Sequence, residues 1–115
     1  MTVIVAGTLD FDPASATECI QTARPHIEGA YRLEGCLQYA FSLDPFNPGR
    51  VYVLMHWETE EALAAYFASR WYIAMRDHLG AWGLKGAWLD KYRADISEPL
   101  YDPATGKARP HFFSM

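Results

Sequence analysis

The residues best suited to chemistry in this sequence gather in segment 60–80, which reads as a helix. Tyr66, Phe67, Arg70, Trp71 and His78 recur there at spacings typical of one helix side and its edges. An imidazole titrates near neutral pH, so His78 is a candidate base for removing a proton from a phenol or an enol. Tyr66 is a candidate donor of a hydrogen bond to a substrate carbonyl or enolate oxygen. His78 and Tyr66 are therefore our candidate catalytic residues.

Aromatic residues elsewhere in the chain offer walls for a flat ligand. Tyr39, Trp57, Phe67 and Trp71 are the candidates for lining an apolar pocket, and Arg70 is the candidate for pairing with an anionic oxygen. We interpret these five residues as candidate substrate-binding residues.

Each candidate also has a purely structural explanation. The helix dipole favours a histidine near a helix C-terminus, which accounts for His78 without catalysis. A long side chain such as that of Arg70 commonly reaches solvent, and aromatic residues at helical spacing are more often core than binding site. His56 precedes Trp57 in a strand, so the two side chains point to opposite faces. Whichever of them faces away from the helices is expected at an interface.

The elements that must position these residues can be read from the pattern. Segment 2–11 is β-branched and apolar, with Gly7 marking a bulge or a close approach to the backbone. Asp12 and Pro13 begin a helix that runs to about Leu33, with a kink expected near Arg24 because Pro25 lacks a backbone donor.

The second half of the chain follows the same alternation. Gly35 marks a left-handed turn between the helix and a strand over 36–43, and the turn 44–49 joins that strand to another over 51–57. Thr59 caps the helix that ends at Gly80, and segment 86–96 alternates as a fourth strand. The order β-α-β-β-α-β predicts an α+β, ferredoxin-like fold with a four-stranded antiparallel sheet and two helices on one face.

Composition narrows the class of protein. The 115 residues carry a net charge of −4 without a Lys/Arg cluster, which argues against binding to nucleic acid. The two cysteines, Cys19 and Cys36, have no metal-ligand spacing, so no metal site is expected. Without a long apolar run or a signal segment, we expect a cytoplasmic protein that does not enter a membrane. We divide the chain into a domain over 1–96 and an extended arm over 97–115.

With this order of elements, the chain resembles the antibiotic biosynthesis monooxygenase family over roughly residues 2–95. Four local matches carry the resemblance, and they are the strand VIVAG, the junction RLEGCLQY, the strand ending in Trp57 followed by ETEEAL, and the alternating last strand. The resemblance implies a homodimeric α+β barrel. It also implies a monooxygenase without metal or flavin, in which molecular oxygen reacts with a small aromatic, polyketide-like or quinol substrate.

The chain departs from the family pattern at several positions. Tyr66 and Trp71 stand where members of the family commonly carry helix histidines, and Met55 stands where a glutamate is frequent. The first strand has no asparagine for the haem-degrading branch, which makes haem degradation a minor alternative. The missing histidines favour a second hypothesis, a non-catalytic ligand-binding or stress-associated dimer on the same scaffold. The sequence alone does not decide whether the chain is an enzyme, and a monooxygenase is the leading hypothesis.

Overall fold

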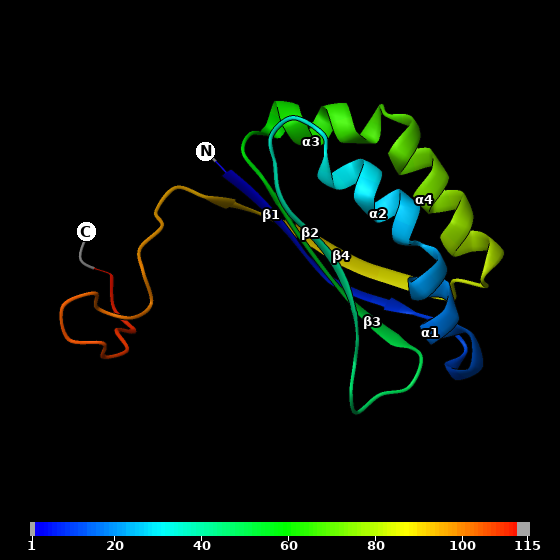
Figure 1. Ribbon diagram of the computed structural model, residues 1–115, viewed down its shortest axis with the longest axis horizontal. Coiled ribbons are helices and arrows are strands. Elements are labelled where there is room, and N and C mark those ends of the chain that lie inside the picture. Colours follow the sequence, from blue (N-terminus) through cyan, green and yellow to red (C-terminus); the bar gives the residue numbers. More distant parts are fainter. Residues whose placement is uncertain (1, 113–115) are drawn as a thin grey trace.

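The computed structural model describes residues 2–112 and contains four strands and four helices (Figure 1). The strands are β1 (Thr2–Asp10), β2 (Cys36–Leu43), β3 (Arg50–Trp57) and β4 (Gly86–Ala94). The helices are α1 (Pro13–Thr22), α2 (Arg24–Tyr31), α3 (Glu60–Phe67) and α4 (Arg70–Ala81).

All strands pair antiparallel in the order β2-β3-β1-β4, and the helices lie on one face of the sheet (Figure 1). This arrangement confirms the predicted ferredoxin-like fold. Residues directly opposite each other in antiparallel strands point to the same face, and the register pairs Val3 with Trp57 and Tyr39 with Met55. Because Met55 and Trp57 are two residues apart on β3, all four side chains share one face of the sheet. All four are buried beneath the helices. Trp57 therefore faces the helices, and His56 faces the other side of the sheet.

Each predicted helix is divided in two. The first break falls at Ala23, immediately before Arg24 and Pro25, as the missing backbone donor of proline predicts. The second break, at Ala68 and Ser69, was not predicted and corrects the single helix over 60–80. The Ser69 hydroxyl donates to the Tyr66 carbonyl at 2.6 Å and accepts from the Tyr72 amide at 3.4 Å, so Ser69 ends one helix and caps the next.

Two turns behave as their residue types predict. The Thr59 hydroxyl accepts from the Ala62 amide at 3.0 Å and caps α3. Gly35 has φ +81°, which glycine adopts without strain, and its carbonyl accepts from the Glu58 amide at 2.7 Å. This bond holds the residue before β2 next to the residue after β3. Gly35 therefore connects the two strands and does not cap α2, which ends at Tyr31.

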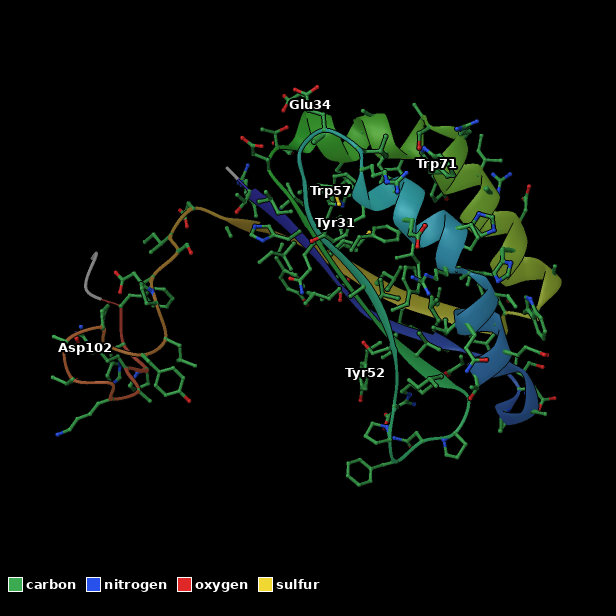
Figure 2. The ribbon with its side chains drawn as sticks, viewed as in Figure 1. Tyr31, Glu34, Tyr52, Trp57, Trp71 and Asp102 are labelled. Carbon is green, nitrogen blue, oxygen red and sulfur yellow. The ribbon has the colours of Figure 1, made fainter. Side chains whose placement is uncertain are left out.

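The face of the sheet away from the helices, which we call the open face, is largely apolar. Its exposed side chains include Trp88 and Tyr92 from β4 and Tyr52 and Leu54 from β3, between 38% and 63% exposed. Tyr52 points away from the helices in Figure 2. An apolar surface of this kind is unusual on a monomer.

Beyond β4 the described chain leaves the sheet and forms a short hairpin that stands apart from the rest of the molecule (Figure 1). Tyr101 pairs with Ala108, and the Asp102 amide donates to the Lys107 carbonyl at 2.8 Å. Asp102, labelled in Figure 2, also forms an ion pair with Arg109 at 3.6 Å.

Replacement of Gly7 by alanine is expected to lower the free energy of unfolding by about 1–3 kcal/mol. A Cβ atom at Gly7 would overlap the backbone carbonyl oxygen of Trp88 and lie 2.8 Å from the Leu89 Cα, so β4 would have to shift. Gly80→Ala in α4 is the control, because no atom lies within 4 Å of its added Cβ and alanine favours helix. Urea denaturation measures both variants. Equal stability of Gly7→Ala and wild type would contradict the close approach of β4.

Candidate active site

Two adjoining cavities lie between the sheet and the helices α3 and α4. The inner chamber has a volume of about 190 Å³, and the outer groove between α3 and β4 has a volume of about 770 Å³. Val5, Phe67 and Leu89 line both, so the two cavities meet at these side chains. The groove exists because the helices cover the other strands of the sheet but leave most of β4 exposed.

The inner chamber has apolar walls from all four strands and from α3 and α4. The strands and the segment before β4 contribute Leu9, Phe41, Val53, Met55, Leu84 and Ala87. The helices contribute Tyr66, Tyr72, Met75, Arg76 and Leu79. Most of these walls are hydrocarbon, which suits an aromatic ligand.

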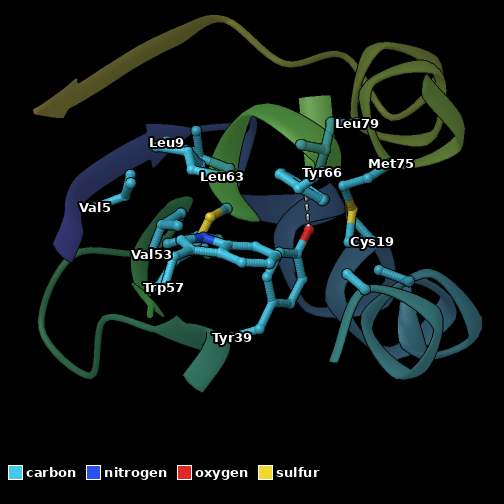
Figure 3. Close-up of a cluster of buried hydrophobic side chains, with 14 of the residues drawn as sticks. Val5, Leu9, Cys19, Tyr39, Val53, Trp57, Leu63, Tyr66, Met75 and Leu79 are labelled. Atoms are coloured by element: carbon cyan, nitrogen blue, oxygen red, sulfur yellow. Dashed lines mark hydrogen bonds between the residues drawn. The ribbon is translucent and has the colours of Figure 1, made fainter. Parts of the chain in front are cut away.

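A pair of buried phenols lies at the wall formed by α3. The hydroxyl oxygens of Tyr39 and Tyr66 are 2.6 Å apart, and both residues are almost fully buried (Figure 3). Tyr66 stacks on Trp57 with ring centroids 5.0 Å apart and meets Tyr72 edge to face at 5.6 Å. These contacts on both sides hold the Tyr66 ring in one position.

The electrostatics of the pair keep both phenols protonated at neutral pH, so each hydroxyl can donate a hydrogen bond. Burial raises the pKa of Tyr66 to about 12, although the hydrogen bond from Tyr39 opposes the shift. Burial raises the pKa of Tyr39 further, with an additional contribution from the neighbouring Tyr66 charge. A phenol that keeps its proton cannot act as a base, but it can donate a hydrogen bond. When Tyr39 donates to Tyr66, the hydrogen of the Tyr66 hydroxyl is free for a ligand.

Phe67 lies at the boundary between the two cavities. Its side chain is half exposed, and its ring meets that of Tyr72 at 4.9 Å with an interplanar angle of 90°. The structure thus places Tyr66 and Phe67 in the cavity walls. Tyr39 and Trp57 lie behind Tyr66, where they support it without lining either cavity.

His78, our candidate base, does not lie in the wall of either cavity. Its Nε2 is 2.8 Å from the Cys19 carbonyl oxygen and 3.3 Å from the Thr22 hydroxyl, both on α1. Because a carbonyl only accepts, Nε2 carries the proton. The His26 ring lies 5.1 Å away. In the described chain, His78 joins α4 to α1 and lines neither cavity.

The pair of imidazoles predicts a dependence of stability on pH. Desolvation, and then the neighbouring His78, lower the pKa of His26 below 6.5. As the pH falls, the unfolded chain therefore binds a proton at His26 before the folded chain does. The free energy of unfolding then falls as the pH falls below about 6.5. Denaturation midpoints measured between pH 7.5 and pH 5 should show a smaller fall for His26→Gln than for wild type. Replacement of the exposed His111 by glutamine is the control, and an equal effect of both variants would contradict the prediction.

Trp71 packs against α2, and the exposed Arg70 lies over the Trp71 ring, so both residues lie outside the cavities. A Cβ atom on Gly29 of α2 would overlap the Trp71 ring, and the Arg70 guanidinium carbon lies 4.4 Å from the centroid of that ring. Figure 2 shows Trp71 on α4. Neither residue lines the inner chamber or the outer groove.

Sequence reasoning missed Tyr72 and Arg76, which do line the inner chamber. A helical wheel drawn through segment 60–80 as one helix puts Trp71 and His78 on the same side as Phe67. The break at Ser69 changes the phase, so Tyr72 and Met75 face the sheet instead. The available signal was Ser69 itself, a residue type that favours the N-cap position.

The charged groups of the two cavities differ. Arg76 is the one charged residue in the described lining of the inner chamber, whereas Glu60, Asp90, Lys91 and Arg93 line the outer groove. Within residues 2–112, no three or more His, Cys, Asp and Glu side chains are grouped to hold a metal ion. No helix in that range is long and apolar enough to cross a membrane.

Comparisons with known proteins agree on the scaffold. The family model described as antibiotic biosynthesis monooxygenase matches residues 2–78. A structure of a "putative antibiotic biosynthesis monooxygenase" from Deinococcus radiodurans has a TM-score of 0.76 at 20% identity and covers 89% of this chain and 100% of its own. The structure of a conserved protein from Methanosarcina mazei has a TM-score of 0.73 at 22% identity, and the match covers 81% of this chain and 92% of that protein. None of the curated proteins matches the chain significantly.

Proposed function

This chain belongs to the antibiotic biosynthesis monooxygenase family, and from that premise we propose that it is an oxygenase that needs no metal or flavin. Its substrate is a small aromatic, polyketide-like or quinol compound that binds in the inner chamber, and molecular oxygen is the co-substrate. The observation that carries the proposal is the apolar chamber with the buried Tyr39–Tyr66 pair at its wall.

The chemistry that fits this site relies on the substrate's own electrons. An activated methylene beside an aromatic ketone loses a proton to give a carbanion, whose enolate oxygen accepts the hydrogen bond of Tyr66. The carbanion transfers electrons to oxygen, a C–O bond forms, and the resulting peroxide loses water to leave a ketone. One atom of dioxygen stays in the ketone, and the other leaves as water with both methylene hydrogens. The methylene carbon supplies all the electrons, so no external reductant is needed.

The protein assists mainly by stabilising the anion and excluding water. The described lining of the inner chamber contains no carboxylate or imidazole to accept the proton. A hydrogen bond from Tyr66 and the positive charge of Arg76 lower the pKa of a bound acid, which favours ionisation without an adjacent base. The proton then passes to water in the outer groove, whose lining includes the carboxylate residue Glu60.

Oxygen uptake with a panel of single-ring hydroquinones and aryl ketones that carry an activated methylene tests the proposal. Purified protein treated with chelator should consume oxygen with at least one substrate, and Tyr66→Phe should lower kcat/KM about tenfold or more. Replacement of the exposed Tyr31 by phenylalanine is the matched control, and His78→Gln should also retain activity because His78 lines neither cavity. Equal activity of Tyr66→Phe and wild type would remove Tyr66 from the mechanism.

The second candidate function is binding of a small aromatic ligand without turnover. The missing base in the described lining of the inner chamber favours it. Ligand binding detected by quenching of tryptophan fluorescence, with no oxygen uptake for any substrate, would support this candidate over the oxygenase.

We also propose that a second copy of the chain covers the open face, giving a homodimer. The support is the apolar surface of Trp88, Tyr92, Tyr52 and Leu54, which the described chain leaves uncovered. Light scattering should give a dimer for wild type and a monomer for Leu54→Glu. Phe46→Glu is the control, because Phe46 is 87% exposed in the turn between β2 and β3 and lies outside this face. Removal of residues 97–115 should leave the dimer intact, and a monomer after this truncation would contradict an interface formed by the open face alone.

A further inference from the structure

The inner chamber has one charged residue in its described lining, and that charge is positive. Arg76 extends from α4, while the other polar groups on the described walls are the phenols Tyr66 and Tyr72. With no carboxylate in the described lining, a bound anion would meet a cation and two potential donors, and the acid nearest to that cation is Asp77, which pairs with Arg76 at the surface. The chamber is therefore electrostatically suited to an anionic ligand.

Arg76 is available for such a ligand. Its guanidinium Nη2 lies 3.3 Å from a carboxylate oxygen of the adjacent Asp77, and the side chains are 59% and 67% exposed. An exposed ion pair between neighbouring residues contributes little stability, so a ligand can replace Asp77 at small cost. The planar guanidinium also matches the two oxygens of a carboxylate, which a lysine would not.

The volume of the chamber limits the size of the ring. An apolar cavity of ~150 Å³ is sufficient for benzene, whereas pockets for drug-sized ligands begin at about 300 Å³. At about 190 Å³, the inner chamber lies near the lower value. It accommodates one ring, and any larger substituent must extend past Phe67 into the outer groove.

We propose that the inner chamber selects a single-ring aromatic carboxylate, with the carboxylate held by Arg76. The inference rests on the proposed function only in taking the inner chamber as the ligand site. It narrows the substrate class from small aromatic compounds in general to anionic ones with one ring, and it assigns Arg76 as the residue that determines this specificity.

Equilibrium binding tests the proposal without turnover. Titration calorimetry with wild type should give at least tenfold tighter binding of benzoate than of benzamide, a neutral molecule of nearly the same shape. Arg76→Gln should reduce that preference to within about twofold while keeping the affinity for benzamide. Arg70→Gln is the matched control, since Arg70 lies on the same helix but stacks on Trp71 outside both cavities. Its preference should remain unchanged.

A second comparison tests ring size at constant charge. Anthracene-9-carboxylate should bind at least tenfold more weakly than benzoate, because three fused rings exceed the chamber. The proposal is overturned if benzamide binds wild type as tightly as benzoate, if Arg70→Gln loses the preference as Arg76→Gln does, or if the larger acid binds equally well. Failure of the oxygenase proposal gives a different result, namely the same binding preferences with no oxygen uptake.

Discussion

Replacing Trp57 with alanine is expected to lower the free energy of unfolding by about 3–5 kcal/mol. Trp57 is fully buried at the end of β3, opposite Val3, and its ring stacks on that of Tyr66. Its Nε1 has no hydrogen-bond partner among the described residues, so the truncation removes packing rather than a hydrogen bond. The cost therefore comes from lost apolar contacts and from the cavity left between sheet and helices.

The exposed Trp88 provides a control of the same residue type. Trp88 is 63% exposed on the open face, and its replacement by alanine should change monomer stability by no more than about 0.5 kcal/mol. Urea denaturation at several protein concentrations separates folding from association through that face. A loss below about 1 kcal/mol for Trp57→Ala would mean that the surrounding residues collapse into the space, and it would contradict a rigidly packed core.

Removing one hydroxyl from the Tyr39–Tyr66 pair is expected to cost about 1–3 kcal/mol, because the remaining phenol is left buried without a partner. Tyr39→Phe and Tyr66→Phe should each show this loss. The double variant removes both hydroxyls together and leaves no unpaired polar group at this contact. Its loss should therefore be no larger than that of either single variant.

A double-mutant cycle from urea denaturation measures the coupling, and non-additivity of at least about 1 kcal/mol is the expected result. Tyr31→Phe, on the exposed end of α2, should add to either change without coupling. Additive losses for Tyr39→Phe and Tyr66→Phe would indicate that each hydroxyl finds another partner, and they would contradict the hydrogen bond by which Tyr39 leaves the hydrogen of Tyr66 free for a ligand.

The sequence was sufficient for the order of the elements because their signals are local. Alternation defined the strands, Pro25 marked the first helix break, and Thr59 and Gly35 marked two turns. The face to which Trp57 points was not determined by alternation alone, since both sides of β3 carry large apolar residues. The strand register settles this point by placing Trp57 opposite Val3.

The candidate site was only partly predictable because its geometry depends on the break at Ser69. Tyr66 and Phe67 precede the break, and both line the inner chamber. Trp71 and His78 follow the break. A helical wheel that treats segment 60–80 as one continuous helix therefore puts them on the wrong side. Arg76 was missed for the same reason. A serine inside a strong helical pattern is a weak signal, since tertiary packing decides whether it ends the helix.

Ser69 also places the two polar groups of the inner chamber on separate helices. Tyr66 belongs to α3 and Arg76 to α4, so the hydroxyl donor and the cation reach the chamber from opposite sides of one helix break. The hydroxyl of Ser69, which donates to the Tyr66 carbonyl and accepts from the Tyr72 amide, therefore also sets the separation of the two groups that a ligand would contact.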